Sequence, residues 1–424
     1  MARERSIQVN RLTRVEGHGN IRLKVAGGEV AEAAFDIVEP PRFFEAFLRG
    51  RPYEEVVRVV SRVCGICAVS HRCAGIKATE AAFGVEVTPL IEDLRKLAMA
   101  GEMMSSHLLH VLFLAAPDYL GVDSVLDLAG KRRALLALAL RLKKAAYDVS
   151  ETVCGRHTHP ITMETGGFTQ PLDQTRLHGL KKRMELREGD LAAFVDLVGG
   201  MAFPSMDREV ATVCLTHPHE YAAYQGRMAK DGEEPVDPSD YADYIAETVK
   251  PPSTAKHSQW QGENYVVGAL SRIRRNFGQL EPEAREAADQ LGVRASASNP
   301  FMNVAAQAVE VVHFWRQSWN ILQRLLNSDL PARDQSVEVS PRAGRGVGAV
   351  EAPRGLLIHE YEYDEDGVCR AVNLIIPTAQ NLASMEEDLK LLARNLEAST
   401  DRELARKLSM MIRAYDPCIS CSAH

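Results

Sequence analysis

The spacing of apolar residues predicts a mainly helical protein. From Leu90 to Val111 apolar residues recur every three or four positions, as on the buried face of a long helix. The same period predicts further helices over 131–148, 174–199, 281–291, 301–327, 381–397 and 400–413. These helices are expected to form one large core.

Short β elements are predicted near both ends of the chain. Apolar and polar residues alternate from Ile7 to Val38 around Gly27 and Gly28, which indicates strands joined by a hairpin turn. A second alternating segment spans 336–376. The expected fold class is therefore mainly α with small antiparallel β elements (α+β).

We expect a single domain over residues 1–424. It would have a β-rich element at 1–50, a helical core at 51–330, and a β segment, helices and a terminal motif at 331–424. Clusters of Pro, Gly, Asp and Ser predict an irregular surface region within the core, at 200–265.

Composition argues against several function classes. The net charge is −7 and no basic stripe stands out, which disfavours nucleic-acid binding. The apolar stretch around 134–140 is interrupted by Arg141, Lys143 and Lys144, so no membrane span is expected. The first residues carry charges but no apolar signal region, which favours a cytoplasmic protein.

Eight cysteines are too few for a disulfide scaffold in a chain of 424 residues, but four of them form two CxxC pairs. Cys64 and Cys67 make the first pair, and Cys418 and Cys421 the second. Two thiolates in such a turn can bind one soft metal, and two turns together make a four-thiolate site. The four single cysteines are interpreted as buried and reduced: Cys73, Cys154, Cys214 and Cys369.

Three alternatives compete with a catalytic metal. Structural zinc sites usually join their pairs over about 12–20 residues, whereas these pairs lie near opposite ends of the chain. A thioredoxin-like pair would lie between a strand and a helix of a βαβ unit, and neither pair does. A local site from Cys64, Cys67, His71 and Cys73 would be cramped and leaves the second pair unexplained. A zinc-stabilised structural or binding subunit thus stays open as the alternative function.

Six motifs in order along the chain resemble the large, catalytic subunit of nickel-iron hydrogenases. They lie at 14–18 (Arg-Val-Glu-Gly-His), 62–71, 155–160, 351–355 (Glu-Ala-Pro-Arg-Gly), 376–378 and 416–424. The first cysteine motif and the ending look most like the cytoplasmic, cofactor-coupled branch, which includes deazaflavin-reducing, heterodisulfide-reductase-linked and NAD-coupled enzymes. The resemblance implies reversible, heterolytic oxidation of dihydrogen.

The resemblance also implies the metal ligands. All four paired cysteines would bind nickel, and Cys67 and Cys421 would bridge to an iron that carries carbon monoxide and cyanide. Glu45 and His424, with a backbone carbonyl from 374–376, would bind a separate magnesium or iron(II) ion.

Further residues receive implied roles around that centre. Glu16 would accept the proton that leaves through Cys418, and Arg354 would lie over the open face of the metals with Asp118 nearby. His71 would donate a hydrogen bond near a bridging thiolate. The pocket for the diatomic ligands would be lined by Pro353, Pro377 and Thr378.

Electrons need a separate path, because no further cysteine cluster could hold iron-sulfur centres. The expected partners are an iron-sulfur small subunit and further electron-transfer subunits with flavin or iron-sulfur groups. The glycines at 344, 346 and 348 are not interpreted as a nucleotide loop, because they precede a strand rather than a helix.

Overall fold

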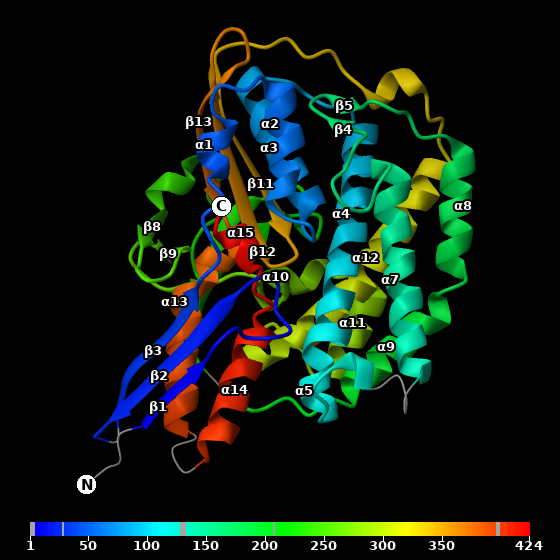
Figure 1. The fold of residues 1–424 in the computed structure, drawn as a ribbon. Coiled ribbons are helices and arrows are strands. Elements are labelled where there is room, and N and C mark those ends of the chain that lie inside the picture. Colours follow the sequence, from blue (N-terminus) through cyan, green and yellow to red (C-terminus); the bar gives the residue numbers. More distant parts are fainter. Residues whose placement is uncertain (1–4, 28, 128–132, 207, 396–398) are drawn as a thin grey trace.

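The computed structural model describes residues 5–27, 29–127, 133–206, 208–395 and 399–424. Long helices lie side by side in a bundle, and a three-stranded sheet stands next to them (Figure 1). The helices are α1 Phe44–Leu48, α2 Tyr53–Val59, α3 Ala68–Phe83, α4 Pro89–Leu109, α5 Ala116–Leu120, α7 Arg133–Cys154, α8 Gln174–Glu185, α9 Glu188–Gly199, α10 Ala269–Asn276, α11 Pro282–Leu291, α12 Asn303–Leu326, α13 Pro377–Asn395, α14 Asp401–Ala414 and α15 Ile419–Ser422. The predicted fold class is confirmed.

The strands form small sheets. β1-β2-β3 and β11-β12-β13 are antiparallel, and the second stands next to the helical bundle. The strands are β1 Arg5–Val9, β2 Gly19–Ala26, β3 Glu29–Ile37, β4 Met163–Glu164, β5 Gly167–Phe168, β6 Ala211–Thr216, β7 Arg227–Lys230, β8 Ile245–Val249, β9 Lys256–Trp260, β10 Tyr265–Val266, β11 Gly344–Ala352, β12 Gly355–Tyr363 and β13 Cys369–Ile375. Part of the predicted first hairpin turn, Gly28, lies outside the described residues.

The core of the bundle is built on α4, which packs against α7 and α12. Thr88 begins α4 by accepting a hydrogen bond from the amide of Ile91, with Pro89 at the first helical position. The segment Pro89–Leu120 is long and apolar enough to cross a membrane by composition, but 83% of its most apolar window is buried inside the protein. It therefore has the burial of a core helix.

Glycines let β11 lie directly on α3. A Cβ at Gly344, Gly346 or Gly348 would stand 2.5, 2.0 or 2.1 Å from the carbonyl oxygens of Ala82, Ala78 and Ala74. The three glycines are every second residue of the strand and therefore face the same side. The three alanines are every fourth residue of the helix, so each glycine contacts a successive helical turn. This contact anchors the helix that begins immediately after Cys67.

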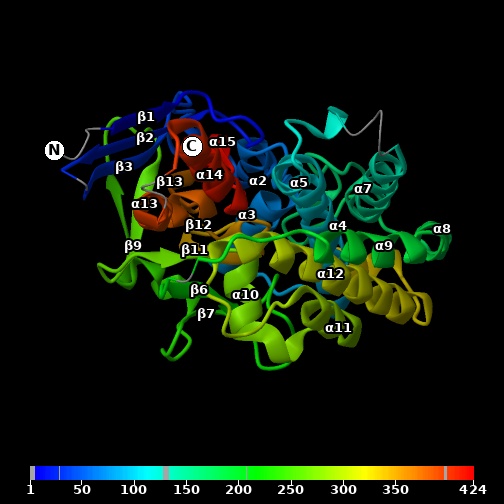
Figure 2. The same cartoon turned by 90° about the horizontal axis from the view of Figure 1, so that it is seen from below.

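The region at 200–265, expected to be irregular, contains loops together with five short strands, β6 to β10. β6, β7 and β10 form one small sheet and β8 and β9 another, and Figure 2 shows β6 and β7 below β11. Val213, Leu215, Trp260 and Tyr265 from this region form a second buried apolar cluster with Ile358 of β12. These strands are two to six residues long, too short for an alternating pattern to stand out among the Pro, Gly and Asp residues around them.

Candidate metal centre

The two cysteine pairs meet in the interior of the protein. Sγ of Cys64 lies 3.4 Å from Sγ of Cys418, Cys67 lies 3.3 Å from Cys421, and Cys418 lies 2.8 Å from Cys421. All four sulfurs are within 4.8 Å of one another and are buried. Since a disulfide bond measures about 2.05 Å, these are four free thiols around one point.

The first pair is held by the start of α3. Cys67 is the residue that begins this helix, and the amides of Ile66 and Cys67 donate to Sγ of Cys64, each at 3.2 Å. The buried carboxylate of Glu102 accepts from the amides of Val69 and Ser70 in the first turn. These contacts satisfy helix amides that would otherwise lack partners. Burial raises the pKa of Glu102 to about 8.

The second pair is held against the N-terminal motif. The amide of Ile419 donates to the carbonyl of Glu16 at 3.0 Å, and the Glu16 carboxylate accepts from the amide and hydroxyl of Ser420. Gly17 has φ +86°, and a Cβ there would stand 2.7 Å from that of Ile419. Only glycine allows the two segments to approach this closely.

The four thiols shift one another's pKa values. Burial raises the pKa of Cys421 to about 11, while neighbouring thiols and then burial raise the pKa of Cys418 well above its usual range. Burial acts the same way on Cys64, but hydrogen bonds from the neighbouring thiols outweigh it and lower its pKa well below the usual range. Four soft donors crowded at one buried point suit a thiophilic metal such as nickel, iron or zinc.

Arg354 lies beside the sulfurs, and each of its three side-chain nitrogens donates one hydrogen bond. Its guanidinium donates to the Asp416 carboxylate at 2.9 Å, the Asp416 carbonyl at 3.2 Å and the Ser106 hydroxyl at 2.7 Å. Burial would lower the pKa of Arg354, but Asp416 and the thiolates hold it well above its usual range. The side chain is therefore a buried, permanent cation.

The predicted place of Asp118 near Arg354 is wrong. The carboxylate of Asp118 binds Arg14 at 2.6 Å and Arg413 at 2.6 Å. The acid at Arg354 is Asp416, which precedes Pro417 and Cys418 in the second motif. The sequence alone could not show whether Asp118 or Asp416 binds Arg354, because both acids are distant from Arg354 along the chain and only the fold brings one of them to it.

A small cavity of about 10 Å³ adjoins the sulfurs. Its walls include Cys67, Cys418, Arg354, Pro377 and Thr378. The Thr378 hydroxyl accepts from the amide of Cys418 at 2.9 Å. Pro353 is not in the wall, and its carbonyl instead accepts from Arg272 at 3.1 Å.

His71 borders the same cavity. Its Nδ1 lies 3.0 Å from Nε2 of His359, and burial lowers the pKa of His71 to about 4. The imidazole is thus neutral at pH 7. Its predicted hydrogen bond to a bridging thiolate remains a prediction.

Glu45 and His424 lie together at the end of the chain. Nε2 of His424 is 3.3 Å from the Glu45 carboxylate, which also accepts from the amide of Leu374 at 3.1 Å. Burial acts to raise the pKa of Glu45, but His424 and Lys256 lower it to about 2. An imidazole and an ionised carboxylate suit magnesium or iron(II).

Three residues at the site were not singled out by the sequence: Glu102, Ser106 and Asp416. Asp416 stood inside the second cysteine motif, so its position was a usable signal. Glu102 and Ser106 lie within the long helix α4, and only the packing of that helix brings them to the centre.

Comparisons with known proteins agree with this geometry. A family model described as nickel-dependent hydrogenase matches residues 42–152 and 203–424, and one described as HoxL-like matches 6–39. The chain is 34% identical to sulfhydrogenase 1 subunit alpha of Pyrococcus furiosus, over 99% of this chain and 97% of that one. Identity to sulfhydrogenase 2 subunit alpha of the same organism is 32%, over 99% and 98%. A crystal structure of an NAD⁺-reducing [NiFe]-hydrogenase in the H₂-reduced state superposes with a TM-score of 0.89 at 28% identity, covering 99% of both chains.

Proposed function

Because the chain belongs to the nickel-dependent hydrogenase family, we propose that it is the catalytic subunit of a nickel-iron hydrogenase that interconverts dihydrogen with protons and electrons. The observation that carries the proposal is the meeting of Cys64 and Cys67 with Cys418 and Cys421 at one buried point. A site assembled from both ends of the chain lies in the dry interior, where a reactive metal is shielded from water.

All four cysteines would bind nickel, and Cys67 and Cys421 would also hold an iron with carbon monoxide and cyanide ligands. When bound, this nickel-iron centre would supply the site at which the H–H bond is cleaved heterolytically. Thiolates are soft donors suited to a redox-active metal, whereas carbon monoxide and cyanide are ligands that no side chain can replace.

The residues around the sulfurs would handle charge and protons. Arg354 is a buried cation that binds Asp416 and Ser106, and its remaining N–H groups can stabilise negative charge and donate to a cyanide nitrogen. Glu16 is joined to the Cys418–Ser420 segment and is the carboxylate we assign to receive the proton from Sγ of Cys418.

We further propose that Glu45 and His424 bind magnesium or iron(II). A cation there would hold the end of the chain, and with it the turn that carries Cys418 and Cys421. The present contact between Nε2 of His424 and the Glu45 carboxylate brings the two donors within reach of one ion.

Electrons would leave through other chains. Among the residues that the structure describes, the paired cysteines form the one group of three or more metal-ligating side chains. We therefore propose an iron-sulfur small subunit and further flavin or iron-sulfur subunits, in a cytoplasmic complex. The names of the relatives, which are alpha subunits, support a multi-subunit assembly.

Elemental analysis of the purified complex, combined with infrared spectroscopy, tests the proposal. Nickel and iron should be present with absorption bands from metal-bound carbon monoxide and cyanide. The complex should also exchange isotope between dihydrogen and water. Zinc alone, without such bands or exchange, would instead support a zinc-stabilised structural subunit.

A further inference from the structure

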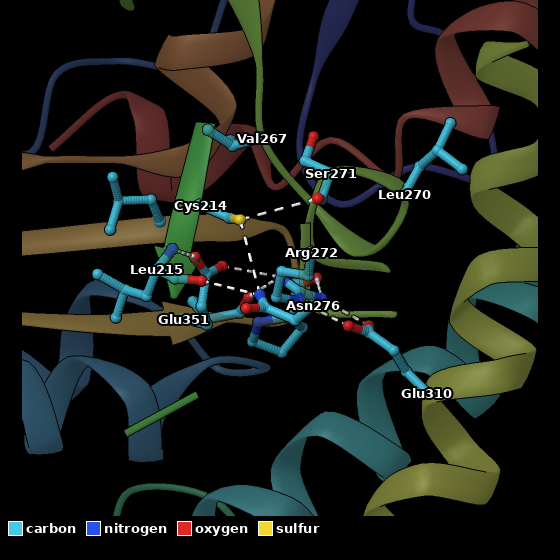
Figure 3. Close-up of polar contacts among 12 residues, drawn as sticks. Cys214, Leu215, Val267, Leu270, Ser271, Arg272, Asn276, Glu310 and Glu351 are labelled. Carbon is cyan, nitrogen blue, oxygen red and sulfur yellow. Dashed lines mark hydrogen bonds and ion pairs between the residues drawn. The ribbon is translucent and has the colours of Figure 1, made fainter. Parts of the chain in front are cut away.

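A buried network of charges contacts the backbone just before Arg354. Its centre is Arg272 on α10, whose side chain has no exposed surface. Figure 3 shows this guanidinium between Glu310 and Glu351. The proposed reaction does not use any of these three residues directly, so the network needs another explanation.

Every nitrogen of the Arg272 guanidinium has an assigned partner. Nε and Nη2 bind the two oxygens of Glu310 at 2.6 Å each, and Nη1 binds Glu351 at 3.0 Å. The remaining hydrogen bonds go to the carbonyls of Ala352 at 3.0 Å and Pro353 at 3.1 Å. This planar fork of five donors is specific to arginine, because lysine has a single nitrogen.

The two carbonyls belong to the turn that carries Arg354. Ala352 pairs with Gly355 across the β11–β12 hairpin, so Pro353 and Arg354 form a two-residue turn. Gly355 has φ +131°, and a Cβ there would stand 2.4 Å from Cγ2 of Val267. The segment that leads into α10 therefore packs directly on the turn.

The partners of Arg272 are themselves fixed. Glu310 on α12 also accepts from the hydroxyl of Tyr221 at 2.6 Å and lies 2.7 Å from Nε2 of His107. One helical turn earlier on α12, Gln307 donates to Asp416 at 3.0 Å. Because Asp416 binds the Arg354 side chain, α12 constrains Arg354 both through its backbone and through its guanidinium.

We propose that Arg272 is a positioning residue for Arg354: its hydrogen bonds to the carbonyls of Ala352 and Pro353 set the place of the Arg354 guanidinium over the four sulfurs. This inference rests on the proposed function, since it concerns how a residue of that site is oriented. Misplacement by about 1 Å in an active site can cost roughly 100-fold in rate. A looser turn should therefore slow catalysis without removing the metal ligands.

The test compares three variants of the complete complex. Arg272→Lys keeps the charge but loses the fork, Arg354→Lys alters the residue that is positioned, and the third carries both changes. Arg95→Lys is the matched control, because Arg95 is also wholly buried and binds both oxygens of Glu80, at 2.9 and 2.7 Å, and its hydrogen-bond partners do not belong to the turn.

Two measurements are made on each variant. The first is isotope exchange between dihydrogen and water, expressed per nickel. The second is hydrogen–deuterium exchange of the peptide spanning 344–363, read by mass spectrometry, which reports on the turn whether or not the complex is active.

Arg272→Lys should lower isotope exchange per nickel about 10- to 100-fold and speed deuterium uptake at the turn, and Arg95→Lys should do neither. In the Arg354→Lys background, Arg272→Lys should cause no further loss. Independent losses that multiply, or equal losses from Arg272→Lys and Arg95→Lys, would overturn the inference.

A second variant covers the case in which Arg272→Lys does not assemble. Glu351→Gln keeps the shape of a side chain that binds Arg272 and the amide of Leu215. Glu351→Gln should lower isotope exchange per nickel by less than Arg272→Lys does. It should cause no further loss in the Arg354→Lys background. Unchanged isotope exchange in Glu351→Gln would refute the positioning role. If the unaltered complex lacks nickel or exchange, the proposed function itself fails, which is a distinct result.

Discussion

Replacing Gly346 by alanine tests whether the close packing of β11 on α3 sets the position of the first cysteine pair. The new Cβ would stand 2.0 Å from the carbonyl oxygen of Ala78 and 2.4 Å from the amide nitrogen of Ala82. Both are backbone atoms, so no side-chain rotation can relieve the overlap. Since a carbon–oxygen contact needs about 3.3 Å, strand and helix must separate by roughly 1 Å.

Overpacking of this kind usually costs 1–3 kcal/mol, and a clash with backbone belongs at the upper end, about 3 kcal/mol. An unfolding entropy near 2.1 cal/mol/K per residue converts this free energy into a fall in Tm of about 3 °C for a chain of this length. The displacement also exceeds the tolerance of about 0.2 Å for metal–ligand distances. Because α3 begins directly after Cys67, nickel content should fall as well.

Scanning calorimetry at one scan rate and nickel analysis of the purified complex measure the two effects. Gly189→Ala is the control, because Gly189 lies in α9 with nothing within 4 Å of the added Cβ. That variant should keep its nickel and its Tm. Equal Tm and nickel content in the two variants would refute the packing argument.

Five further variants probe the site and its surroundings. Glu16→Gln should keep its nickel but slow isotope exchange about 100-fold or more, as expected when a proton acceptor is lost; unchanged exchange would reject its role. Glu45→Gln should lower the magnesium or iron(II) content of the complex by metal analysis while infrared bands of the main centre persist in the fraction that folds, and full retention of that ion would contradict the assignment. Asp416→Asn should slow exchange per nickel, whereas Asp118→Asn should cost about 3 kcal/mol of stability with exchange retained; the reverse pattern would restore Asp118 to the site. The folded-state pKa of Glu102 is raised to about 8, so its contribution to stability is present below pH 4.5 and is lost as pH rises toward 8; Tm measured across this range should therefore fall less in Glu102→Gln than in the unaltered protein.

Long helices were predictable because their period is a local property. The helix predicted over 301–327 is α12, Asn303–Leu326, and the one predicted over 281–291 is α11, Pro282–Leu291. Each buries an apolar face that recurs every three or four residues. The strands at 211–266 escaped prediction because they are two to six residues long, which leaves too few positions for an alternating pattern to stand out.

The candidate metal ligands were predictable for a different reason. Thiolates in CxxC turns have few other uses in a reduced protein, so Cys64, Cys67, Cys418 and Cys421 could be selected from their chemistry and spacing. That all four meet is a property of the fold, in which Cys64 and Cys418 lie 354 positions apart in sequence and 3.4 Å apart in space.

The sequence by itself determined the helical periods and the soft donor set, because both depend on residue type and short spacing. The tertiary structure alone decided which acid neutralises Arg354, why Gly346 must be glycine and what contacts the Arg354 turn. Asp416, Ala78 and Arg272 reach their partners only when distant segments pack together. Such pairings depend on distances in space, and no local pattern of residues encodes those distances.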